Sequence, residues 1–141
     1  MVRRARVFLS VAQELLERNE HDLAVFNAEQ AVQLRLKALL YRLWGIIPRS
    51  HSIRWLLGLL RDSLLRAGLG EAAEKVDEFV RSNRSLLAAL EDAYTLTKYG
   101  HLEYDYELAS RLLALSENLW RLLEEVEKLA IDLGETGSGE T

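Results

Sequence analysis

The sequence has no cysteine and a single proline among its 141 residues. Without cysteine there is no disulfide bond and no thiolate metal site, and a reducing compartment is compatible with the chain. Because Pro48 is the only strong helix breaker, helices can run long. Thirty of the residues are leucine, which loses little rotamer freedom in a helix. The composition therefore predicts an all-α protein.

Long uncharged apolar runs are also missing. The longest one in the apolar segments, residues 55–60, is far too short to span a bilayer. The first residues place Arg3, Arg4 and Arg6 before apolar positions, but Glu14 and Glu17 interrupt the pattern too early for a signal peptide. We therefore expect a cytoplasmic protein that has no membrane partner.

The charges are unevenly distributed along the chain. Residues 1–66 carry a net charge of +5, whereas residues 67–141 carry −9. A basic half can meet phosphates and an acidic half can meet a basic partner. The simpler interpretation, which we favour, is that the two halves pack together and neutralise each other, since a bundle brings distant segments side by side.

Apolar residues recur at three- and four-residue spacing in segments that end at Asn19, Gly45, Gly68 and Ser82-Asn83. Ser50 is the predicted N-cap of the third helix. The predicted helices cover residues 3–18, 22–44, 51–67, 71–80, 85–98 and 105–133. Their short connections favour an antiparallel up-and-down bundle of four main helices plus one or two short ones. We expect one domain at residues 1–133 and a disordered tail at 134–141.

Motifs for metal binding or catalysis are absent from the sequence. His21, His51 and His101 are far apart, no two of them form a pair at i, i+4, and the sequence has no HExxH or Glu-x-x-His motif. There is no nucleophile motif, and the glycines sit singly at helix ends rather than in a phosphate-binding loop. The sequence therefore predicts no metal and no cofactor.

Three basic residues gather near the junction of the second and third helices. Lys37 lies among apolar neighbours, and Arg49 and His51 follow Pro48. A helix N-terminus favours negative charge, and the arginine fork suits phosphate, so this corner is a candidate phosphate site. Two alternatives stay open, namely that Lys37 only extends its ammonium to water and that His51 only bonds to the loop.

A second group of basic and aromatic residues precedes the last helix. Lys98 and Tyr99 are followed by Gly100 and His101, and aromatic residues interleaved with basic ones can stack bases and hold phosphates. Four acidic residues flank this group, at positions 91, 92, 103 and 105, and for that reason loop packing is the favoured interpretation.

The order of these motifs resembles the HEPN domain family. Residues 26–40 look like the second-helix signature of the family, Q-A-x-E-K-x-L-K-A-L, and Pro48 with Ser50-His51 looks like its proline turn and Thr/Ser-His pair. Residues 98–100 approximate a later Arg-Tyr-Pro, and residues 106–109 resemble the start of the last helix. The resemblance covers about residues 5–130.

The resemblance implies an antiparallel helical bundle that forms a homodimer. It also implies a minimal nucleotidyltransferase as a partner in a toxin–antitoxin-like module, and a nucleotide or RNA as ligand. By position, Lys37, His51, Lys98 and Tyr99 match places where the family keeps polar residues. Some members are metal-independent ribonucleases that use an Arg-x(4–6)-His motif.

This chain departs from the ribonuclease pattern. No histidine follows an arginine at that spacing, and Gln33 stands where the family has glutamate. The leading hypothesis is therefore a homodimer that binds a nucleotide or RNA phosphate near Lys37, Arg49 and His51 without an evident catalytic group. The alternatives are a pure protein–protein interaction module without ligand, and a ribonuclease that uses His51 with Arg49 as a phosphate clamp.

Overall fold

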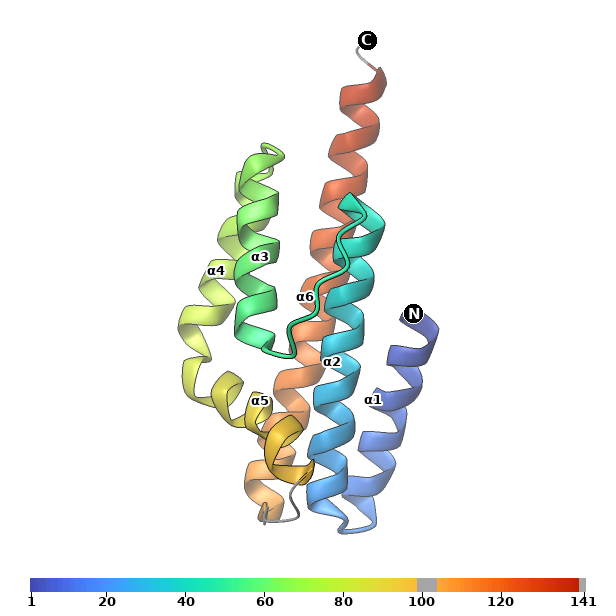
Figure 1. Cartoon of the computed structure of the whole chain (residues 1–141), viewed down its shortest axis with the longest axis vertical. Coiled ribbons are helices and arrows are strands. Elements are labelled where there is room, and N and C mark those ends of the chain that lie inside the picture. Colours follow the sequence, from blue (N-terminus) through green and yellow to red (C-terminus); the bar gives the residue numbers. More distant parts are fainter. Residues whose placement is uncertain (99–103, 140–141) are drawn as a thin grey trace.

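The computed structural model describes residues 1–98 and 104–139, with side chains described at 1–95 and 104–133. Six helices and no strand make up this part of the chain (Figure 1). The helices are α1 (Val2–Glu17), α2 (His21–Trp44), α3 (Ile53–Arg66), α4 (Gly70–Ser82), α5 (Arg84–Lys98) and α6 (Tyr106–Gly139). The prediction of an all-helical bundle is confirmed.

The helix α2 lies at the centre of the bundle. It packs against α1, α3, α5 and α6, and twelve of its 24 residues are buried. The sequence shows apolar residues on several sides of this helix, and the structure explains them because the same chain covers those sides. This arrangement leaves the polar residues of α2 little access to water.

The connection between α2 and α3 gives the bundle its topology. The pairs α1–α2 and α3–α4 are antiparallel neighbours, as short connections favour. Residues 45–52, however, run back along α2 before α3 begins, so that α3 ascends in the same direction as α2 (Figure 1). An eight-residue return segment without helix therefore lies against the central helix.

Helix ends fall where the sequence predicts breaks. Among the described residues, Asn19, Gly45 and Gly68 have positive φ angles of 61°, 69° and 78°. Gly45 adopts the left-handed conformation, and its N–H donates to carbonyls of the last turn of α2. At the other end of the chain, α6 continues to Gly139, beyond the predicted end at Leu133, because isolated glycines weaken a helix without breaking it.

The core is built mainly from leucine. Buried leucines from α2, α3, α5 and α6 meet in one cluster, which also takes in alanines and valines of α1, α2 and α4. Within the described residues, no helix has both the length and the apolar character required to cross a membrane.

Two adjacent leucines of α3 test this packing. Leu64 is fully buried, whereas Leu65 is 55% exposed. We expect Leu64→Ala to lower the free energy of unfolding by about 2–5 kcal/mol, because it removes buried methyl groups and leaves a cavity. Leu65→Ala, the matched control, should change it by less than about 1 kcal/mol. Urea denaturation followed by circular dichroism measures both, and equal losses in the two variants would contradict the packing of α3.

Candidate functional site

The return segment brings His51 against the middle of α2. The Nδ1 atom of His51 lies 3.2 Å from Oε1 of Gln33, which is buried on α2. The imidazole ring also stacks on the ring of Tyr94 from α5, with centroids 4.4 Å apart and planes 15° apart. His51 itself is exposed. The site therefore lies where α2, α5 and the return segment meet.

Behind Gln33, a carboxyl group is buried in α2. The Nε2 atom of Gln33 donates a hydrogen bond to Oε1 of Glu29, and Nε2 of Gln30 donates to Oε2 at 2.8 Å. Glu29 has no exposed surface. Burial raises its pKa to about 7, although the two amide hydrogen bonds and the attraction of Lys37 act in the opposite direction. The Glu29 carboxyl therefore changes charge near neutral pH.

The start of α3 is fixed by Ser52 and Glu91. The Ser52 hydroxyl accepts a hydrogen bond from the Trp55 N–H at 3.1 Å and donates to Oε1 of Glu91 at 2.7 Å. The Arg54 N–H donates to the same oxygen at 3.0 Å, and the Arg54 guanidinium lies 2.9 Å from Oε2. Glu91 thus ties α5 to the first turn of α3.

These contacts correct two expectations about α3. The N-cap is Ser52 rather than Ser50, whose hydroxyl instead accepts a hydrogen bond from the Ser52 N–H. His51 consequently lies before the helix and not in its first turn. The N-terminus of α3 already holds an anion of the protein itself, the Glu91 carboxylate. Burial alone raises the pKa of Glu91, but hydrogen bonds from Arg54 and Ser52 outweigh this and hold the pKa below its usual value.

Lys37 and Arg49 are the cations beside this site. Lys37 is half-buried and attracts the Glu29 carboxylate, whereas Arg49 is exposed. Arg49 precedes His51 by two residues in the return segment, which spans at most about 7 Å, and Lys37 lies about 6 Å along α2 from Gln33. Arg49 and Lys37 are therefore near the same level of the bundle. Among the described side chains, neither has an acidic ion-pair partner within 4 Å, unlike Arg54.

The other two predicted site residues are Lys98 and Tyr99. Lys98 is the last residue of α5, but its side chain lies outside the described residues, as does Tyr99 entirely. Tyr94, one helical turn earlier in α5, is the described residue of this helix that contacts His51. The structure places His51 against Gln33 and Tyr94. A shared site of Lys37, Arg49 and His51 and the roles of Lys98 and Tyr99 stay predictions.

Several residues of the site were missed in the sequence. Glu29 and Gln33 lie four residues apart in an otherwise apolar part of α2, and this spacing is a signal that places both on one helix face. Tyr94 and Glu91 carry no comparable signal, because only the tertiary fold brings α5 to the return segment.

A second polar cluster joins α2 to α6. Buried Arg35 forms an ion pair with Glu127 at 2.8 Å, and Arg42 approaches the other oxygen of Glu127 at 3.4 Å. The guanidinium carbons of Arg35 and Arg6 lie 5.5 and 5.2 Å from the centroid of the Trp120 ring. The single carboxylate of Glu127 faces two guanidinium groups, and the Nε and Nη1 atoms of Arg35 are buried without a hydrogen-bond partner among the described residues. The contacts of the cluster join α1, α2 and α6.

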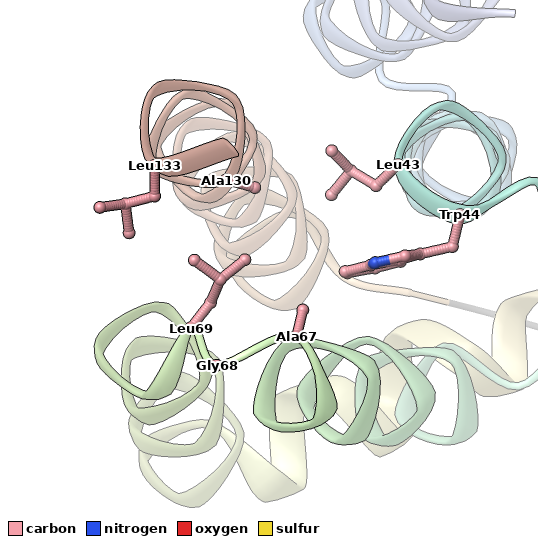
Figure 2. Close-up of a pocket in the computed structure, with 7 residues that line it drawn as sticks. All are labelled: Leu43, Trp44, Ala67, Gly68, Leu69, Ala130 and Leu133. Atoms are coloured by element: carbon pink, nitrogen blue, oxygen red, sulfur yellow. The ribbon is translucent and has the colours of Figure 1, made fainter. Parts of the chain in front are cut away.

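An apolar cleft of about 400 Å³ lies at the end of the bundle where α2 stops (Figure 2). It is lined by residues of α2, the α3–α4 turn and α6, namely Leu43, Trp44, Ala67, Gly68, Leu69, Ala130 and Leu133. None of these side chains is titratable, so the cleft lacks the charges of the His51 corner. Elsewhere too, the described part of the chain contains no group of three His, Cys, Asp or Glu residues suited to a metal ion.

The described residues form an all-helical fold in which three contacting polar side chains, Glu29, Gln33 and His51, lead from the interior to the surface. The family model of the HEPN domain matches residues 1–126, and the chain belongs to the HEPN domain family. Neither comparison with curated proteins nor comparison with solved structures gives a match.

The raised pKa of Glu29 predicts a pH-dependent stability. Between pH 4.5 and about 7, the folded protein retains a proton that the unfolded chain has released. The free energy of unfolding therefore falls as pH rises through this window, by on the order of 3 kcal/mol. Glu29→Gln removes this contribution and preserves the shape of the side chain, so the variant should gain stability relative to wild type as pH rises and level off above about pH 8.

Urea denaturation at a series of pH values measures this difference directly. Other titrating groups, including Glu91, are present in both proteins and cancel in the comparison. A stability difference between Glu29→Gln and wild type that stays constant from about pH 5 to 9 would contradict the buried, near-neutral titration of Glu29.

Proposed function

We propose that the protein binds the phosphate of a nucleotide or an RNA at the corner formed by Lys37, Arg49 and His51. Two cations without acidic ion-pair partners among the described side chains carry this proposal: Arg49, two residues before the exposed His51, and Lys37, one helical turn after Gln33, which His51 contacts. Guanidinium and ammonium groups left unpaired in this way are the usual donors to phosphate oxygens. Membership in the HEPN domain family is consistent with a nucleotide or RNA as the ligand.

The ring stack beside the cations favours a nucleotide over a bare phosphate. His51 lies on Tyr94 and is exposed. Bases of single-stranded nucleic acids stack on such rings while cations hold the neighbouring phosphate. The stacked rings would therefore bind the base of a nucleotide, and the cations would bind its phosphate.

The buried Glu29 gives the corner a pH dependence. Its carboxylate attracts Lys37 when it is ionised, and this negative charge opposes a phosphate at the same ammonium. Loss of the charge below about pH 7 removes the opposition. Phosphate affinity is therefore expected to increase as the pH falls through neutrality.

Thermal unfolding with ligand tests the proposal. A ligand that binds only the folded state stabilises it by about 2.7 kcal/mol at 100 times Kd, which raises Tm by several degrees. We expect this shift with ATP, a mononucleotide or a short single-stranded RNA, and a smaller shift with inorganic phosphate. The double variant Lys37→Gln and Arg49→Gln should lose most of it.

The matched control is the double variant Lys128→Gln and Arg84→Gln, which removes the same charges from exposed positions elsewhere in the chain. Wild-type protein that shows no shift with any of these ligands would rule out the proposed site. Equal losses in the two double variants would mean that the effect comes from net charge alone.

We further propose that the protein forms a homodimer and pairs with a minimal nucleotidyltransferase in a toxin–antitoxin-like module. Family membership supports this proposal. The exposed apolar side chains of Trp55 and Leu65, 53% and 55% accessible on α3, supply apolar surface for such a contact.

Sedimentation equilibrium at micromolar concentration should therefore give the mass of two chains, twice 16.1 kDa. The mass of one chain over the whole concentration range would contradict the homodimer. Co-elution with a minimal nucleotidyltransferase on size-exclusion chromatography tests the partner separately.

A further inference from the structure

Three polar side chains form a continuous chain from the interior of the bundle to its surface. Glu29 is fully buried, Gln33 is 4% exposed, and His51 is exposed. Gln33 donates to Glu29 through Nε2 and faces Nδ1 of His51, 3.2 Å away, through Oε1. Gln33 therefore bridges the buried carboxyl group and the imidazole.

The direction of hydrogen bonding along this chain follows from its first member. An ionised carboxylate only accepts hydrogen bonds, so the NH₂ group of Gln33 must face Glu29 and its carbonyl oxygen must face His51. A carbonyl oxygen also only accepts, and Nδ1 of His51 must therefore carry the proton. When the ring is neutral, this leaves the lone pair on Nε2.

We propose that Gln33 is a positioning residue that transmits the charge of Glu29 to His51 and fixes which ring nitrogen carries the proton. The tautomer of His51 matters for ligand binding only if a phosphate binds beside this residue, so that part of the proposal rests on the proposed function. In histidine sites generally, the hydrogen bond made by one ring nitrogen decides the state of the other. Here the amide of Gln33 lies between the Glu29 carboxylate and the His51 ring, so the negative charge of Glu29 stays buried while its effect on hydrogen bonding reaches His51.

The chain can also run in the opposite direction. A protonated Glu29 becomes a donor, and rotation of the Gln33 amide then presents its NH₂ group to His51 and makes Nδ1 an acceptor. The charged groups that face Glu29 are Lys37 on α2, which opposes protonation, and Glu91 on α5, which favours it. One proton on Glu29 therefore sets the polarity of all three side chains.

NMR of uniformly ¹⁵N-labelled protein tests this assignment, since long-range ¹H–¹⁵N correlations identify the protonated nitrogen of each neutral imidazole. His51→Asn assigns the His51 signals among the three histidines. At about pH 8.5, where Glu29 is ionised, wild-type protein should show Nδ1–H as the major tautomer of His51. Gln33→Met should shift His51 to Nε2–H, the form that predominates in free side chains.

Two further variants separate transmission from general disturbance of α2. Gln30→Met removes the other amide that donates to Glu29 and leaves the contact between Gln33 and His51 in place, so the tautomer should stay that of wild type. Glu29→Gln, which preserves the shape of the side chain, removes the acceptor-only constraint and should lower the Nδ1–H population. Backbone ¹H–¹⁵N spectra confirm that each variant is folded.

The proposal is overturned if wild-type His51 is mainly Nε2–H, if Gln33→Met keeps the wild-type tautomer, or if Gln30→Met changes it as much as Gln33→Met does. A Glu29→Gln variant with an unchanged tautomer would show that Gln33 acts without Glu29. All spectra are recorded without nucleotide, and nucleotide binding is measured separately by thermal unfolding. A failure of nucleotide binding is thereby distinguished from a failure of Gln33 to fix the tautomer of His51.

Discussion

The enclosure of α2 by four other helices is the constraint on which the structure depends. A polar side chain on a surrounded helix must find its partners inside the protein, because an unpaired buried group costs free energy. α2 carries three buried polar side chains, Glu29, Gln33 and Arg35, and the two ionisable ones are paired differently. Arg35 is neutralised by Glu127 of α6, whereas Glu29 is held by neutral amides of its own helix and has no ion pair.

This difference separates a structural cluster from a candidate site. The Arg35–Glu127 pair is close to charge-balanced, and removal of either partner would leave a buried charge. Glu29 instead has a pKa of about 7, so a modest change in its surroundings alters its charge at neutral pH. The group with the most adjustable charge is also the one linked, through Gln33, to the exposed His51 beside the basic corner.

The helices were predictable because leucine spacing and breakers such as Gly45 are local signals. The start of α3 was less predictable from the sequence. Ser50 and Ser52 are equally good N-caps by sequence, and Glu91, which selects Ser52, lies 39 residues further along the chain. For the same reason the sequence of α2 and its connection could suggest Lys37, Arg49 and His51 as site candidates, while the contacts of Tyr94 and Glu91 could not be predicted. The role of Glu29 depends on burial by other helices, which no local pattern expresses.

The length of the return segment, residues 45–52, sets the position of His51 along α2. Residues 45–52 run back along α2 without helix (Figure 1). Because a fully extended chain spans at most about 3.4 Å per residue, each residue added to or removed from residues 45–50 would slide His51 by up to this length, roughly two residues of helix rise. A one-residue change would thus carry the imidazole past Gln33 toward a different side chain of α2. The length of this loop, independently of its composition, selects which buried group of the central helix communicates with the surface.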